Sequence, residues 1–97
     1  MSFNKGLMNH WDEYYKKDNI PDYPSPFAEY VVNKLSNQQT ILEVGCGNGR
    51  DAKFLASKGH LVTGLDRSGK AIELCKKLYS VESLEFFFGT ITDIAKI

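Results

Sequence analysis

A glycine-rich turn directly after a short apolar segment constrains the fold of this chain more than any other feature. Residues 40–44 form the apolar segment, and Gly45, Gly47 and Gly49 follow it at alternate positions. Because glycine has no Cβ, such a turn can adopt positive φ angles and lets a ligand lie against bare backbone. The pattern predicts a β-strand, a tight loop and a helix whose first amides face the same cavity, which is the first half of a βαβ unit.

The second half of this unit follows at once. Residues 50–58 carry the apolar stripe of a helix, and Gly59 is expected to end it in the left-handed conformation. Residues 60–66 form a second apolar strand that ends on Asp66, 17 residues after Gly49. A second parallel strand delivers its last residue beside the glycine loop, where an acid can accept hydrogen bonds from ribose hydroxyls. Asp66 is therefore a candidate ribose-binding residue.

The rest of the core repeats this alternation of helix and strand. Ser68 is expected to cap a crossover helix over 69–78, and the aromatic segment 83–88 predicts a third strand that is bounded by Gly89. Residues 90–97 then form a loop and begin the next helix. Right-handed crossovers predict a parallel sheet in the order 3-2-1, with helices on both faces and a ligand at the carboxyl ends of the strands.

Residues 1–39 are expected to form a cap of two helices ahead of the βαβαβ core at 40–97. Apolar and aromatic side chains recur every three or four positions over 7–17, which predicts an amphipathic helix. All three prolines lie in the ordered linker 18–26, and Ser25 is expected to cap a second helix that ends near Ser36. The predicted apolar face of this second helix comprises Phe27, Tyr30, Val31, Val32 and Leu35.

The composition is that of a single globular domain and excludes several classes of partner. A chain of 97 residues supports one core. Its 12 basic and 12 acidic residues give no net charge and form no long block, which disfavours nucleic acid or an anionic membrane as the partner. No apolar run approaches the roughly 18 residues of a membrane span, so we expect a cytoplasmic protein. Cys46 and Cys75 lack metal-ligand spacing, and Cys46 is interpreted as a small loop residue and not as a nucleophile.

The sequence EVGCGNGR at 43–50, together with the segment from Gly59 to Asp66, resembles the class I S-adenosylmethionine-dependent methyltransferases. In this resemblance motif I runs from Glu43 to Gly49, and Asp66 is the acid of motif II. The resemblance implies a Rossmann-like three-layer α/β/α fold, with S-adenosylmethionine as cofactor and S-adenosylhomocysteine as product. The G-x-G-x-G spacing differs from the G-x-G-x-x-G of dinucleotide-binding domains and disfavours NAD.

The resemblance also implies roles for individual residues. Backbone groups of the glycine loop would line the methionine and ribose portion of the cofactor, Glu43 would face its ammonium group, and Asp66 would bind the ribose diol. Arg67 and Ser68 would flank the adenine. A tyrosine of the first helix would close over the site, unless it only packs against the body. The predicted cofactor-binding residues are Glu43, Gly45, Cys46, Gly47, Gly49, Asp66, Arg67, Ser68, Thr90, Ile91, Tyr14 and Tyr15.

Two departures from the family pattern limit what the resemblance implies. Where similar enzymes have Gly-Asp at the end of the third strand, Thr90 follows Gly89 and the next acid is Asp93, so adenine recognition is assigned to Thr90, Ile91 or Asp93. The sequence also stops before the fourth strand, which lies beside the first in similar enzymes and carries the residues nearest the methyl. We therefore expect a piece of a longer parent, and no catalytic residue can be named. The first strand would then be an exposed edge available for self-association.

Three hypotheses for function follow. The leading one is the cofactor-binding half of a methyltransferase that acts on oxygen, nitrogen or carbon of a small molecule. The second is a catalytically inert module that binds or oligomerises through its open strand edge. The third is an NAD-binding domain, which the glycine spacing disfavours.

Overall fold

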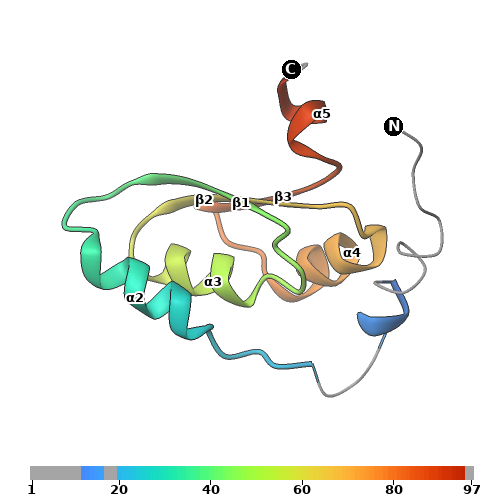
Figure 1. The fold of residues 1–97 in the computed structure, drawn as a ribbon, viewed down its shortest axis with the longest axis horizontal. Coiled ribbons are helices and arrows are strands. Elements are labelled where there is room, and N and C mark those ends of the chain that lie inside the picture. The colour runs from blue at the N-terminus through green and yellow to red at the C-terminus, as the bar shows by residue number, and fades with distance from the viewer. Residues whose placement is uncertain (1–11, 17–19, 96–97) are drawn as a thin grey trace.

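The computed structural model describes residues 12–16 and 20–95 of the chain, and its centre is a three-stranded parallel sheet (Figure 1). The elements are α2 (Pro26–Lys34), β1 (Thr40–Val44), α3 (Arg50–Ser57), β2 (Leu61–Asp66), α4 (Gly69–Leu78), β3 (Leu84–Phe88) and α5 (Ile91–Ala95). Of the helix predicted over 7–17, the structure describes residues 12–16, which form a short helical segment at 12–14 followed by a turn; the remainder lies outside the described residues.

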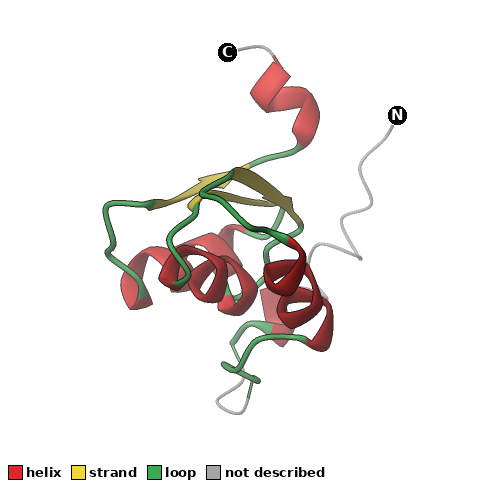
Figure 2. Ribbon diagram, turned by 90° about the vertical axis from the view of Figure 1, so that its left-hand side faces the viewer, coloured by secondary structure: helices red, strands yellow, loops and turns green. Residues whose placement is uncertain are grey.

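The strands pair in parallel in the order β1-β2-β3, which confirms the predicted α/β class and the order 3-2-1. Figures 1 and 2 show α2, α3 and α4 on one face of the sheet, whereas α5 stands on the other side. The two crossover helices share one face because both right-handed crossovers advance across the sheet in the same direction. Among the described residues β1 pairs only with β2, so its outer edge has no strand partner there.

The helix ends carry the predicted capping residues. The Ser25 side chain accepts a hydrogen bond from the Ala28 amide at the start of α2, and Pro26 occupies the first helical turn. The Ser68 side chain does the same for the Ala71 amide of α4. Each cap satisfies an amide that would otherwise lack a partner and typically contributes about 1 kcal/mol. These two predictions are confirmed.

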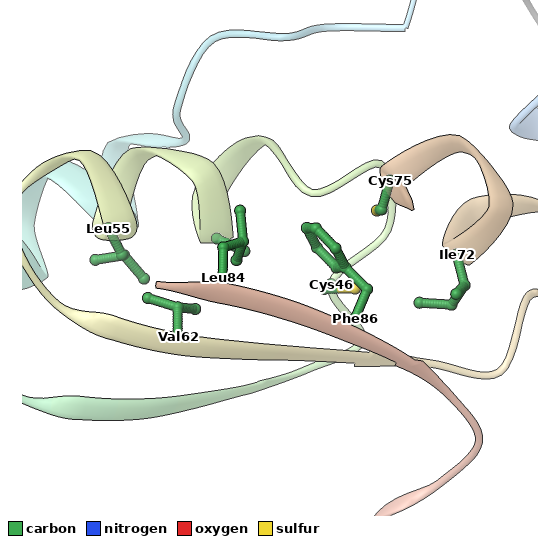
Figure 3. Close-up of a cluster of buried hydrophobic side chains, with 8 residues drawn as sticks. Cys46, Leu55, Val62, Ile72, Cys75, Leu84 and Phe86 are labelled. Atoms are coloured by element: carbon green, nitrogen blue, oxygen red, sulfur yellow. The ribbon is translucent and has the colours of Figure 1, made fainter. Parts of the chain in front are cut away.

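The core lies between the sheet and the helices α3 and α4 (Figure 3). Leu55 and Ile72 project from the helices toward Val62 and Phe86 of the strands, and all four are at most 5% exposed. Each such side chain contributes about 1.5 to 3 kcal/mol through burial. The full buried cluster comprises Cys46, Ala52, Leu55, Val62, Ile72, Cys75, Leu84 and Phe86.

The predicted apolar face of α2 is partly wrong. Phe27 and Tyr30 are 73% and 60% exposed, whereas the neighbouring Ala28 is 3% exposed. Val31 and Val32 do pack against the core cluster, as predicted. Among the described elements α2 has its main contact with α3, and a small side chain at the contact lets two helices approach closely. The larger side chains of Phe27 and Tyr30 therefore remain exposed to solvent.

We expect Gly64→Ala to lower the free energy of unfolding by about 1 to 3 kcal/mol, the usual cost of overpacking a core. A Cβ at Gly64 would lie 2.8 Å from Phe86 Cδ1 and 3.0 Å from Cys46 Sγ. Urea unfolding measures the loss. Gly69→Ala is the matched control, because its Cβ would lie 3.7 Å from the nearest atom, in Phe88. Equal stability of the two variants would contradict the proposed close packing at Gly64.

Candidate cofactor site

The glycine loop is held at the carboxyl ends of β1 and β2 by its own backbone amides. Gly45 and Gly47 have φ angles of +75° and +57°, which favour glycine over every other residue. The amide of Gly45 donates to the Leu65 carbonyl at 2.7 Å, and the amide of Gly47 donates to Asp66 Oδ2 at 2.8 Å. The structure therefore brings Gly47 and Asp66 together at the carboxyl ends of the strands, as the sequence predicts.

Gly49 serves the packing beneath the loop. Its φ angle is +82°, and a Cβ there would lie 2.9 Å from Cys75 Sγ and 3.1 Å from the rings of Phe86 and Tyr79. No side chain fits between the loop, α4 and β3 at this point. Gly49 thus lets α3 begin against the core, and it is not among the residues that line the cavity described next.

A cavity of about 190 Å³ lies beside the loop. Two segments far apart in the sequence form its walls: the described residues ahead of α2, and the loop with the end of β1 and the start of α3. Six of the predicted site residues line this cavity, and the sequence did not predict the other five lining residues. The lining comprises Tyr14, Tyr15, Ile20, Pro21, Glu43, Gly45, Cys46, Gly47, Asn48, Arg50 and Asp51.

Tyr15 lies directly over Gly47. A Cβ on Gly47 would be 2.5 Å from the Tyr15 hydroxyl oxygen and 3.3 Å from Cζ of its ring. Burial, together with the charge of Asp66, raises the pKa of Tyr15 to about 12. The phenol is therefore protonated at neutral pH and can donate a hydrogen bond. Tyr14 packs edge-on against the Tyr15 ring, with 5.0 Å between the ring centroids.

Glu43 places an unsatisfied acceptor in the wall of the cavity. Its Oε1 atom is buried and makes no hydrogen bond. Burial, reinforced by the charge of Asp51 and partly offset by that of Arg50, raises the pKa of Glu43 to about 7. A buried carboxylate oxygen without a partner is costly, so the site favours a cationic or hydrogen-bond-donating ligand group at this position.

Asp66 organises the loop and keeps capacity for a ligand. Its Oδ2 accepts from the Gly47 amide and its Oδ1 from the Ser68 amide, both at 2.8 Å. A carboxylate offers about four lone-pair sites, so two amides leave room for further donors. Asp66 is half-buried, at the boundary between the loop and the start of α4.

Five predicted residues lie at the carboxyl ends of β2 and β3 or directly after them but do not line this cavity: Asp66, Arg67, Ser68, Thr90 and Ile91. Ser68 is 1% exposed, its hydroxyl bonds Asp12 and the Ala71 amide, and its own amide donates to Asp66. Thr90 and Asp93 cap α5 reciprocally, with the Thr90 amide donating to Asp93 Oδ2 at 2.7 Å. Adenine contacts by these residues stay a prediction.

Two lining residues that the sequence did not predict, Asn48 and Asp51, bind distant parts of the chain. Asn48 is 7% exposed, and its Nδ2 donates to the Pro21 carbonyl at 2.7 Å, which ties the linker to the glycine loop. Asp51 accepts from both the amide and the hydroxyl of Ser25 at 2.7 Å. The available signal was the polar character of Asn48 and Asp51, one and two positions from Gly49, but nothing in the sequence pairs these residues with the linker.

Two thiols lie against the Gly47 carbonyl. Cys75 Sγ donates to it at 3.2 Å, and Cys46 Sγ is 3.9 Å away. A hydrogen bond with the Cys75 thiol, together with burial, raises the pKa of the Cys46 thiol. Cys46 is therefore protonated at neutral pH, which supports its interpretation as a packing residue.

Two features are absent from residues 12–16 and 20–95, the part of the chain that the structure describes. That part of the chain holds no cluster of three or more His, Cys, Asp or Glu side chains suited to bind a metal ion. None of its helices has the length and apolar character that crossing a membrane requires.

A family model described as a methyltransferase domain matches residues 41–96. The ubiquinone biosynthesis O-methyltransferase of Nitrosomonas europaea is 32% identical over 95 residues, a match that covers 94% of this chain and 37% of that protein. The malonyl-[acyl-carrier protein] O-methyltransferase of Priestia megaterium is 32% identical over 98 residues, covering 94% of this chain and 35% of that protein.

The fold has a counterpart among solved structures. A SAM-dependent methyltransferase from Anabaena variabilis superposes with a TM-score of 0.62 at 25% identity, over 91% of this chain and 40% of that chain. The present chain thus spans about a third of the length of the curated relatives it matches.

Proposed function

Because this chain belongs to the class I S-adenosylmethionine-dependent methyltransferases, we propose that it binds that cofactor beside Gly47 and forms the cofactor-binding part of a small-molecule methyltransferase. The observation that carries the proposal is the buried, unpartnered Oε1 of Glu43 in the cavity wall. The methionine part of the cofactor carries an ammonium group, whose donors and charge suit this acceptor.

The residues around Glu43 also fit the cofactor. A Cβ at Gly45 would meet nothing within 4 Å, so the loop leaves open space against bare backbone at that point. Asp66 has lone pairs left for two ribose hydroxyls. The Tyr15 hydroxyl lies over Gly47 and borders the space beside the loop backbone.

When bound, the cofactor supplies a methyl group on a positively charged sulfur that a nucleophile can attack in line. The described residues act by positioning: the loop backbone and Asp66 fix the nucleoside end, and Glu43 fixes the amino-acid end. Tyr14 and Tyr15 line the cavity and would shield a bound cofactor from water. None of the residues described is assigned as a base for the acceptor.

The names of the relatives support a small-molecule acceptor, because two proteins that are 32% identical are O-methyltransferases of ubiquinone biosynthesis and of malonyl-[acyl-carrier protein]. Transfer to an oxygen atom is the finer proposal. The inert, self-associating module is the second candidate, and the unpaired outer edge of β1 in the described sheet favours it. The two candidates differ in whether the folded chain binds cofactor.

Isothermal titration with S-adenosylhomocysteine and with NAD tests the proposal. We expect the first to bind and NAD to give no signal. A folded chain that binds neither favours the inert module, and tighter binding of NAD would overturn the assignment.

Glu43→Gln adds a sharper prediction. The pKa of Glu43 is raised from 4.5 to about 7, so the folded chain holds an extra proton between these values. The stability that this proton contributes is complete below pH 4.5 and is lost as the pH rises through 7. At pH 8 we expect the free energy of unfolding of Glu43→Gln to exceed that of the unaltered chain by roughly 2 kcal/mol. This is less than the full cost of the raised pKa, because partial solvent access screens the Glu43 charge.

The same variant should bind S-adenosylhomocysteine at least tenfold more weakly, since the amide has no charge to offer the ammonium group. Gain of stability with loss of binding distinguishes a ligand-binding carboxylate from a structural one. Glu85→Gln, at an exposed position of β3, is the matched control and should change neither quantity. A Glu43→Gln variant with unaltered affinity would remove Glu43 from the site.

A further inference from the structure

The N-terminus of α4 receives an acid from a remote part of the chain. No acidic residue lies in the first turn of α4 itself. Asp12 takes this position: its Oδ1 accepts a hydrogen bond from the Ser68 hydroxyl and lies 3.4 Å from the Lys70 amide. A carboxylate at this end of a helix is favoured by the helix dipole and by amides that lack partners within the helix.

Ser68 links Asp12 to the glycine loop through continuous hydrogen bonds. The Ser68 hydroxyl donates to Asp12, and the Ser68 amide donates to Asp66 Oδ1 at 2.8 Å. The other oxygen of Asp66 accepts from the Gly47 amide at 2.8 Å. Ser68 is 1% exposed, so water competes little for these bonds.

The same short segment returns to the glycine loop through Tyr15. Tyr15 is three residues after Asp12, and its hydroxyl lies over Gly47. The segment 12–16 therefore contacts the loop network at two points, through the Asp12 carboxylate and through the Tyr15 ring. We propose that Asp12 is a positioning residue that fastens this segment to the start of α4 so that Tyr15 covers Gly47.

The consequence for the cofactor rests on the proposed function. With Asp12 in place, Tyr15 stays over the site and slows ligand departure; without it, the segment 12–16 leaves the loop more often and the ligand escapes faster. Asp12 acts through Tyr15 and needs no contact with the ligand. Its effect should therefore vanish once the Tyr15 side chain is removed.

The first experiment needs no ligand. Trypsin can cleave after the exposed Lys16, and cleavage there reports release of the segment. At a temperature where every variant is folded, we expect Asp12→Ala to be cleaved about tenfold faster than the unaltered chain, the factor for losing a hydrogen bond to a charged acceptor. Asp12→Asn retains an acceptor oxygen and should restore most of the protection.

Glu73→Ala is the matched control for this experiment. It removes one negative charge from the same helix, where Glu73 pairs with Lys70 at 3.4 Å, and it leaves the segment 12–16 untouched. Its cleavage rate should equal that of the unaltered chain. Equal cleavage of Asp12→Ala and the unaltered chain would overturn the proposal.

The second experiment measures the dissociation rate of S-adenosylhomocysteine. We expect Asp12→Ala to raise this rate about tenfold, and to change nothing further in a Tyr15→Ala background. Independent, additive effects of the two substitutions would show that Asp12 does not act through Tyr15. If the unaltered chain does not bind S-adenosylhomocysteine, the proposed function fails, and the cleavage experiment still decides the role of Asp12.

Discussion

Asp66→Ala is expected to weaken S-adenosylhomocysteine binding about a hundredfold or more. The substitution removes the acceptor for the Gly47 amide, the acceptor for the Ser68 amide and the predicted acceptor for the ribose hydroxyls. Losing hydrogen bonds to a charged group costs about 1.5 to 3 kcal/mol each, and the two amides would also lose a partner in a half-buried position. Isothermal titration measures the change in affinity.

The control for this experiment is Glu85→Ala, which removes a carboxylate from an exposed position of the neighbouring strand and should leave the affinity unchanged. Urea unfolding of both variants separates lost binding from lost structure. An Asp66→Ala variant that is folded and binds with unaltered affinity would exclude Asp66 from the cofactor site.

Gly47→Ala should have an effect of similar size for a steric reason. The φ angle of +57° costs a residue with a Cβ about 1 to 2 kcal/mol, and the new methyl group would lie 2.5 Å from the Tyr15 hydroxyl oxygen. Tyr15 must then leave its place over the loop, and the bare backbone that faces the ligand is covered. We expect S-adenosylhomocysteine binding to fall below detection in isothermal titration.

Two variants divide this effect into its parts. Gly45→Ala meets the same backbone strain, at φ +75°, but its Cβ would contact nothing within 4 Å, so it should destabilise the fold less than Gly47→Ala. Adding Tyr15→Ala to Gly47→Ala should recover the stability lost to the clash. If the double variant is no more stable than Gly47→Ala, the Tyr15 ring does not lie where the structure places it.

The sequence alone determined the framework of the site. Alternate glycines permit positive φ angles, apolar runs of five or six residues form strands, and right-handed crossovers that advance in one direction give the order found. From these local rules the strand order, the Ser25 and Ser68 caps and the adjacency of Gly47 and Asp66 could be predicted. Each depends on backbone geometry that a few neighbouring residues impose.

The tertiary structure alone decided which remote residues meet at that framework. Asp12 at the start of α4 and Asn48 on the Pro21 carbonyl join segments that no local pattern pairs. The resemblance implied a tyrosine over the site, but only the structure places the Tyr15 ring over Gly47. The exposure of Phe27 and Tyr30 on α2 was likewise unpredicted, because periodicity shows that a helix has an apolar stripe but not which part of it finds a partner. Such contacts depend on how whole elements pack, and packing is settled only when the complete chain is folded.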